Sequence, residues 1–501
     1  MKDEVLRMDR VTYQEQGATE LDHFCLNLYA GEIMGLIPVN DTGFEALFKL
    51  MSQNLPIHYG YIYYRGKMVN QWKQSDYSYN RIGVIYPKSG LADDLTVADN
   101  VFVMRHGFRK HLIQRKVLEK QLEPFLEEIG VHLSAETVAR ELSPYHRVVT
   151  EIVKAVVADC RLIVLIELGT VIGEERLSRL HQIVRHYAEK GFTFLYVSQH
   201  YEETAQLCSQ VALMLNGQIA KVLSTRDTTS ALLNGCFGVD KYNELVKAQA
   251  RPRPSPGSTL PAMEIQNLRY GRIEKLNLRI LPGECVVLQD MNNHIFDDLI
   301  RILSRENQPE TGSIRVDGRL YSRKNRRKLA IIDCLAPETM IFPELSYLDN
   351  LCFTMDHLLP GVWRKKRARR SIRREWERKL GGEVFDLPVE GLSRREKYEL
   401  VYSRVMLQRP SVTVCVQPFM HADMAHRMCI WTLMEGLLEQ DSAVVILAVN
   451  LADSLAFADR LIRIRQGTVL SEYQREEFGS LPENTPWHDL WQPVKPDGGE
   501  R

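Results

Sequence analysis

The chain has 501 residues, 64 basic and 64 acidic side chains, and a hydrophobic fraction of 45%. This length suits two domains of roughly 220 to 240 residues each, and the balanced charge gives no global attraction to nucleic acid or to an anionic membrane. No apolar run approaches the ~20 residues that cross a bilayer, and the start at Met1-Lys2-Asp3-Glu4 lacks the apolar segment of a signal peptide. We therefore expect a cytoplasmic protein. Its nine cysteines include no CxxC pair, so we expect reduced cysteines and no metal site.

The chain repeats itself at a nearly constant offset. Gly31-Glu32 returns as Gly283-Glu284, 252 residues later, and Leu142-Ser143 returns as Leu392-Ser393, 250 residues later. Spacing kept over half the chain indicates one fold written twice in tandem. The predicted organisation is a first domain at 1–245, a proline-rich linker at 246–262, a second domain at 263–475 and a mobile tail at 476–501.

Each copy begins with strands and a hairpin, followed by a short apolar strand, a loop and an amphipathic helix. The strand and helix are expected at 32–37 and 45–50 in the first copy, and at 284–288 and 297–302 in the second. Strand, loop and helix in this order form the frame of a phosphate-binding turn.

Farther along, unalternating apolar strands are separated by helices. They are expected at 162–166 and 192–197 in the first copy, and at 412–416 and 444–448 in the second. Such strands are typical of a parallel sheet covered on both faces, which places the chain in the α/β class.

Three segments of the first copy resemble the ATP-binding cassette. Residues 95–102 resemble the segment after its Q-loop, Leu142-Ser143 with 151–155 its signature helix, and 196–203 its switch region. With the tandem layout, the chain resembles the ATP-binding subunits of bacterial sugar importers of the ribose and galactose type, over about residues 5 to 470. The resemblance implies two P-loop NTPase-like domains, each a mainly parallel sheet with an antiparallel β subdomain and a helical subdomain. It also implies an integral-membrane permease as partner.

The phosphate-binding loop of the family, GxxxxGK[ST], is altered in both copies. In the family register, Phe44 and Glu45 replace the Lys and the Ser/Thr of the first copy, and Phe296 and Asp297 replace those of the second. A carboxylate about 4 Å from a phosphate oxygen costs on the order of 4 kcal/mol at an effective dielectric of 20. We therefore expect no nucleotide cofactor, whereas ATP and Mg²⁺ would bind if catalysis were unorthodox. The other pocket remnants implied by the resemblance are Asn40 and Gly43 in the first loop, and Tyr13 and Tyr270 where the family stacks adenine.

The two acids that follow the phenylalanines have three interpretations. They cap the first turn of their helices, they face solvent without a role, or Glu45 helps to hold Mg²⁺. Tyr13 and Tyr270 likewise have a plain alternative as core residues.

The resemblance also assigns the catalytic positions. Glu167 keeps the catalytic acid of the first copy, whereas Gln417 stands in the second, and an amide cannot act as a general base. Glu167 is interpreted either as a residual base or as a retained acid at a strand end. The other changed positions are Ile166 and Val416 for the Mg²⁺-orienting aspartate, Pro87 for the Q-loop glutamine, and Gln199 and Val449 for the switch histidine.

The signature loops keep their first two residues, Leu142-Ser143 and Leu392-Ser393, and then diverge. Tyr145 and Arg395 occupy a glycine position where a side chain would intrude on nucleotide. If the two copies close head to tail, Glu45 would face Arg394-Arg395 and Asp297 would face residues 145–147. Ion pairs would then replace bridging ATP.

The most basic stretch runs from Arg364 to Lys379 in the second copy. It is interpreted as a solvated helix face, with contact to anionic lipid or an acidic partner as the alternative. Nucleic acid is not expected, since the run lacks the aromatic platform of single-strand binders. In the tail, Trp487 and Trp491 are either a docking peptide or exposed residues without a role.

Three functions remain in view. The chain is a pseudo-ATPase that scaffolds or regulates a permease, peripheral at the membrane and possibly homodimeric. Alternatively, it is an active transport ATPase that uses Glu167, or a cassette that binds nucleic acid through residues 364–379.

Overall fold

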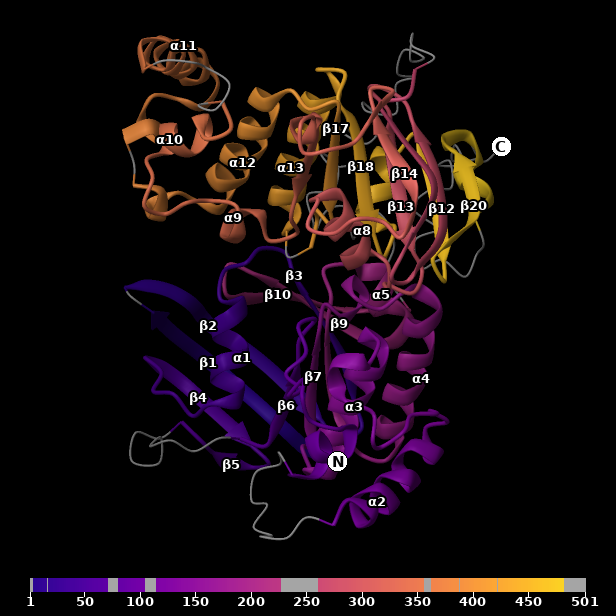
Figure 1. Ribbon diagram of the computed structural model, residues 1–501. Helices are drawn as coiled ribbons and strands as arrows, with labels where there is room; N and C mark the ends of the chain where they lie inside the picture. Colours follow the sequence, from indigo (N-terminus) through magenta and orange to yellow (C-terminus); the bar gives the residue numbers. More distant parts are fainter. Residues whose placement is uncertain are drawn as a thin grey trace, which may run out of the picture. The chain divides into compact units, whose positions relative to one another are not determined.

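The computed structural model (Figure 1) describes residues 3–15, 17–70, 80–103, 114–226, 260–355, 362–386, 388–420 and 422–481. The chain divides into two compact units, Met1–Val239 and Asp240–Arg501. Most of the predicted linker and the tail from residue 482, with Trp487 and Trp491, lie outside the described residues.

The first unit is built on a six-stranded sheet in the order β10-β9-β3-β8-β7-β6. All neighbours pair in parallel except β9 and β10, which form an antiparallel hairpin. The strands are β3 Ile33–Pro38, β6 Ile82–Ile85, β7 Leu162–Ile166, β8 Thr193–Val197, β9 Gln210–Leu215 and β10 Gln218–Ser224. The helices are α1 Phe44–Ser52, α2 Arg115–Glu128, α3 Pro144–Val157, α4 Glu174–Glu189 and α5 Tyr201–Leu207.

Both faces of this sheet are buried. In β7, Ile163 and Leu165 join the core that includes α3 and α4, whereas Leu162, Val164 and Ile166 join the core that includes α1 and the antiparallel sheet. Apolar residues therefore occupy every position of the strand, as predicted for a covered parallel sheet.

A second sheet of the first unit is antiparallel, in the order β2-β1-β4-β5. Its strands are β1 Glu4–Glu15, β2 Ala18–Tyr29, β4 Tyr59–Tyr64 and β5 Lys67–Met68. Gly66, with φ 73°, makes the turn between β4 and β5, a left-handed conformation that suits glycine. This is the predicted antiparallel β subdomain.

The second unit repeats the plan within one ten-stranded sheet, β15-β14-β11-β12-β20-β19-β13-β18-β17-β16. Its antiparallel and parallel parts are joined by a single parallel pair, Lys275 with Thr468. The strands are β11 Met263–Tyr270, β12 Ile273–Ile280, β13 Cys285–Asp290, β14 Thr311–Val316, β15 Arg319–Leu320, β16 Leu329–Ile332, β17 Val412–Val416, β18 Ala443–Ala448, β19 Arg460–Arg465 and β20 Thr468–Gln474. The helices are α8 Phe296–Leu303, α9 Ala336–Thr339, α10 Tyr347–Cys352, α11 Val362–Leu380, α12 Arg394–Gln408, α13 Met424–Leu438 and α14 Ala452–Phe457.

The last described element is a 3-10 helix, η7 Arg475–Ser480. Phe478 and Leu481 are buried in the core of the second unit. The second domain therefore extends to at least Leu481, beyond the boundary predicted at 475. Among the described residues, no helix is both long and apolar enough to cross a membrane.

Candidate functional site: two altered phosphate-binding loops

The loop between β3 and α1 is held by contacts within the first domain. Asn40 donates its amide to the Asn216 side chain at 2.6 Å and accepts the Asn216 backbone N–H at 3.0 Å. At the end of the loop, the Gly43 N–H donates to a carboxylate oxygen of Glu20, on β2, at 3.0 Å. A backbone donor that precedes helix α1 is thereby bonded to an acid of the same chain.

Gly43 is required by its surroundings. Its φ is 76°, and a Cβ built there would lie 2.2 Å from the Glu20 carbonyl oxygen and 2.7 Å from a Leu21 methyl. Neither approach is compatible with a side chain. The retained glycine therefore serves a close contact with β2, whether or not a phosphate binds nearby.

The loop between β13 and α8 is closed in a different way, by Asp290. This residue stands at the first glycine of the family motif, and its side chain is fully buried. One carboxylate oxygen accepts the Asn292 N–H at 3.1 Å, and the other accepts the N–H groups of His294 at 2.5 Å and Ile295 at 2.7 Å. Backbone N–H groups of such a loop normally cradle the phosphates of a bound nucleotide. In this domain an internal carboxylate takes them.

The two phenylalanines that replace the lysine differ in burial. Phe296 is buried in the core of the second domain. Phe44 is half-buried and packs edge-on against Phe48, with ring centroids 5.0 Å apart. Neither position supplies a cation to a phosphate.

Glu45 and Asp297 are both exposed. Within the described residues, neither carboxylate accepts a hydrogen bond from its loop, and α1 and α8 lack a side-chain N-cap bond. Both acids lie in the first turn of their helices, but neither caps its helix through a hydrogen bond. The carboxylates that satisfy the loop donors are Glu20 and Asp290.

Glu167 and Gln417 occupy equivalent strand ends. Their backbones are left-handed, with φ of 51° and 40°, and each donates its N–H to the neighbouring strand, to Val197 and Leu447 respectively. Glu167 is 4% exposed. The preceding residue, Ile166, belongs to the core, so no acid next to Glu167 on that strand offers a ligand for Mg²⁺.

The switch segment of the first domain contains a buried polar cluster that the sequence did not reveal. Tyr196 donates its hydroxyl to Glu203, Ser198 donates to the same carboxylate at 3.2 Å, and His181 lies 3.3 Å from the Tyr196 hydroxyl. Burial lowers the pKa of His181 to about 4 and raises the pKa of Tyr196. Gln199 is half-buried beside this cluster.

The equivalent switch position of the second domain is apolar. Val449 is buried, and its carbonyl accepts the Gln289 amide at 3.2 Å. Gln289 in turn accepts a bond from Arg463 at 2.9 Å.

The signature serines act as helix N-caps. Ser143 accepts the His146 N–H at 3.3 Å at the start of α3, and Ser393 accepts the Glu396 N–H at 3.3 Å at the start of α12. The Glu396 carboxylate in turn accepts the Ser393 N–H at 2.7 Å, which completes a capping box. Leu142 and Leu392, which precede these caps, are buried.

The residues after the serines are engaged within their own domains. Tyr145 is buried, with the Arg176 guanidinium 5.3 Å from its ring centroid. Arg394 lies 3.7 Å from Glu338, and Arg395 donates to Glu399 at 3.1 Å. The head-to-tail pairing with Glu45 and Asp297 stays a prediction.

The two tyrosines expected near adenine differ in burial. Tyr13 is 9% exposed and packs in the antiparallel-sheet core, edge-on to His58. Tyr270 is half-buried and accepts a hydrogen bond from the Asn307 amide. Tyr13 thus fits the core interpretation.

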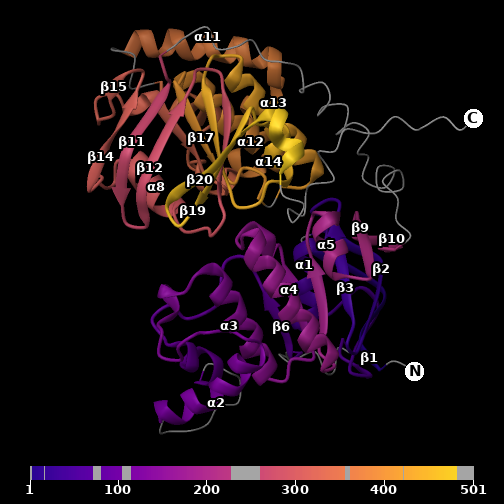
Figure 2. The same ribbon diagram turned by 90° about the vertical axis from the view of Figure 1, so that its right-hand side faces the viewer.

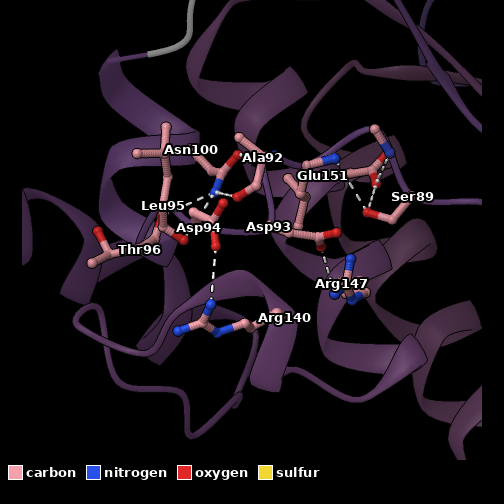
Figure 3. Close-up of polar contacts among 12 residues, drawn as sticks. Ser89, Ala92, Asp93, Asp94, Leu95, Thr96, Asn100, Arg140, Arg147 and Glu151 are labelled. Atoms are coloured by element: carbon pink, nitrogen blue, oxygen red, sulfur yellow. Dashed lines mark hydrogen bonds and ion pairs between the residues drawn. The ribbon is translucent and has the colours of Figure 1, made fainter.

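Sequence reasoning also missed the polar contacts that join the segment after Pro87 to helix α3 (Figure 3). The buried Glu151 accepts bonds from the Ser89 hydroxyl at 2.5 Å and the Gly90 N–H at 3.0 Å, and burial raises its pKa. Asp93 pairs with Arg147 at 2.8 Å. A Q-loop-like segment and the signature helix are therefore tied together.

The same region is organised by Asn100, which is fully buried. Its amide binds the carbonyls of Ala92, Leu95 and Thr96, and its oxygen accepts the Ala92 N–H at 2.9 Å (Figure 3). A signal was present in the sequence, because Asp99-Asn100 returns as Asp349-Asn350 at the 250-residue offset.

The chain is similar to several known proteins. Residues 21–167 match the family model for the ABC transporter. The chain is 24% identical to the ribose import ATP-binding protein RbsA 1 of Rubrobacter xylanophilus over 483 residues, covering 94% of this chain and 96% of that protein. It is 26% identical to the ribose import ATP-binding protein RbsA of Rhodococcus jostii, covering 90% of each. A solved cbiO1 of Clostridium perfringens, part of the ABC transporter complex cbiONQ, is 18% identical with a TM-score of 0.40, covering 44% of this chain and 92% of that one.

The matched segment lies in the first unit, and the second unit repeats the plan of the first. More particularly, the chain is similar over 90% or more of its length to proteins named as ribose import ATP-binding proteins.

Proposed function

We propose that this chain is a pseudo-ATPase of the sugar-importer type, which scaffolds or regulates a membrane permease without hydrolysing ATP. The observation that carries the proposal is the Asp290 carboxylate, which accepts three backbone N–H groups of the second loop. A phosphate bound there would compete for these N–H groups with a fully buried carboxylate, which has the same sign of charge.

The electrostatics of this loop support the proposal. Hydrogen bonds to a charged group contribute roughly 1.5 to 3 kcal/mol each, so nucleotide would have to break several of them before gaining any contact. It would gain no lysine in return, because Phe296 is in the core. The first loop supports the same conclusion less strongly, through the bond from Gly43 to Glu20.

The main alternative is an active subunit with unorthodox catalysis. It would use the buried Glu167 as base and the first domain alone, because the second domain has Gln417 at this position. An orienting group for Mg²⁺ would have to come from elsewhere, since Ile166 is a core residue.

Equilibrium dialysis of the full chain with labelled Mg·ATP, together with thermal unfolding, tests the proposal. A ligand present at 100 times its Kd stabilises the native state by about 2.7 kcal/mol, which raises the Tm of a domain of this size by roughly 5 to 10 °C. We expect no saturable binding and no such rise at millimolar Mg·ATP. Micromolar binding would overturn the proposal, and ATP hydrolysis abolished by Glu167→Gln would establish the alternative.

The partner is tested separately. We expect more of the full chain to co-purify with membranes that carry its permease than with membranes of the same lipids that lack it. Co-purification with RNA in place of membranes would contradict this part of the proposal.

A further inference from the structure

Helix α11 of the second domain is unusually basic. It carries ten basic and two acidic side chains between Val362 and Leu380. Figure 2 shows it as a long rod at the margin of its domain. Its equivalent in the first domain, α2, carries three basic and four acidic side chains. The excess charge therefore belongs to one copy only.

One side of α11 is committed to its own domain. Ile372 and Trp376 are buried in the core. Arg369 pairs with Asp349, at the start of α10, at 2.5 Å, and Arg373 pairs with Glu377 at 2.6 Å. The burial of Ile372 and Trp376 and the pair of Arg369 with Asp349 fix the rotation of the helix about its axis, whereas the pair of Arg373 with Glu377 lies within the helix.

The opposite side is a cationic stripe, formed by Lys366, Arg367, Arg370, Arg374 and Arg378. All five are exposed, and none has an ion pair within the part of the chain that the structure describes. Four of them are spaced by four residues, so the stripe follows one face for about 18 Å. Because these cations are exposed, they stay hydrated and lose no solvation free energy. They remain available to bind an anionic surface.

We infer that the cationic stripe of α11 binds the phosphate headgroups of an anionic lipid surface. Three observations favour lipid over other anionic partners. Between residues 365 and 378, the part of α11 whose side chains are described, no large apolar side chain is exposed, whereas protein interfaces depend on buried aromatic or apolar anchors. Among the side chains that the structure describes on this helix, residues 365–378, no aromatic one is exposed for stacking nucleic-acid bases. The cations also follow one another along a single helix, which suits a surface of mobile headgroups better than a ligand of fixed shape.

This inference extends the membrane-scaffold role to a direct lipid contact, and it needs neither nucleotide nor permease. Each cation close to an anionic surface contributes about a fivefold factor in binding. Removing three of the five charges should therefore weaken binding about a hundredfold.

The test is cosedimentation of the full chain with vesicles of phosphatidylcholine that contain about one third phosphatidylglycerol, at about 0.1 M salt, where the Debye length is ~10 Å. The triple variant R370Q/R374Q/R378Q should lose vesicle binding about a hundredfold. The matched control R115Q/K116Q/K120Q removes three exposed cations from α2 and should bind as the native chain does. The variant R370K/R374K/R378K should also retain binding, because it keeps the charge.

Three results would overturn the inference: equal loss of binding in the α2 control, unchanged binding in the glutamine variant of α11, or equal binding to vesicles of phosphatidylcholine alone. Displacement of the chain from anionic vesicles by duplex RNA at equal phosphate concentration would identify nucleic acid as the preferred partner and would overturn it as well. Because these vesicles contain no permease, a negative result here leaves the pseudo-ATPase proposal standing, and nucleotide binding would leave the lipid contact standing.

Discussion

Asn100 and Asn350 make the same set of hydrogen bonds, each within its own domain. The Asn350 amide binds the carbonyls of Phe342, Leu345 and Ser346, and its oxygen accepts the Phe342 N–H at 2.9 Å. These partners follow those of Asn100 by 250 residues. Both domains have thus kept a buried asparagine that holds the loop before the helical subdomain by the same hydrogen bonds, whereas the residues of the nucleotide pocket differ.

Replacing either asparagine with alanine should destabilise its domain by about 2 to 4 kcal/mol, because buried carbonyls and one N–H lose their partner. Urea unfolding of the full chain measures the loss. Asn100→Asp is the sharper variant, since a carboxylate would face the same carbonyls, and it should be at least as destabilising. Losses below 0.5 kcal/mol for both alanine variants would show that water replaces the asparagine side chain.

The buried carboxylate of the second loop gives a matched pair of variants. Asp290→Ala should destabilise the second domain by about 2 to 4 kcal/mol, because three loop N–H groups lose a charged acceptor. Asp290→Asn should cost less, since an amide oxygen still accepts. Asp297→Ala, on the exposed side of the same helix start, should stay within about 0.5 kcal/mol.

Hydrogen exchange gives a second measurement on the same variants. The amides of Asn292, His294 and Ile295 should exchange faster in Asp290→Ala than in the native chain. Equal exchange rates and equal unfolding curves for Asp290→Ala and Asp297→Ala would contradict the role assigned to Asp290.

The parallel sheet could be predicted from the sequence because burial on both faces leaves a direct signal. The strand 162–166 is apolar at every position, and the structure places β7 at Leu162–Ile166. Signature helices beginning at Leu-Ser were predicted for a similar reason, since serine followed by a helix-forming run is a local cap signal.

The role of Asp290 could not be predicted in the same way. In the sequence it appears only as the loss of a glycine, and its partners are backbone groups whose positions depend on the conformation of the loop. The contact from Gly43 to Glu20 was hidden for another reason, because the two residues meet only after β2 has been placed beside the loop. Residue identity gives no measure of such non-local contacts.

Two glycines with similar backbones allow steric contact to be separated from backbone strain. Gly43 has φ 76° and no space for a Cβ, whereas Gly66 has φ 73° and no atom within 4 Å of the position that a Cβ would take. Gly66→Ala should cost about 1 to 2 kcal/mol from the left-handed backbone alone. Gly43→Ala should cost about 2 kcal/mol more, because the loop must move away from Glu20. Thermal unfolding checks the difference, and equal costs would show that β2 yields without penalty.

The burial of His181 predicts that the unfolding free energy of the first domain depends on pH. The unperturbed pKa of histidine is ≈ 6.5, and burial lowers that of His181 to about 4. Between pH 4 and pH 6.5, His181 therefore binds a proton in the unfolded chain but not in the folded chain. The contribution of the neutral, buried His181 to stability is complete above pH 6.5 and is lost as the pH falls toward 4. The loss approaches about 3 kcal/mol. His181→Gln should remove it, so that the difference in unfolding free energy between native and variant protein narrows as urea unfolding is repeated at lower pH. The exposed His132→Gln is the control and should follow the native curve. Parallel curves for native and His181→Gln protein from pH 7 down to pH 4.5 would mean that His181 takes up a proton in the folded state, against the burial beside Tyr196.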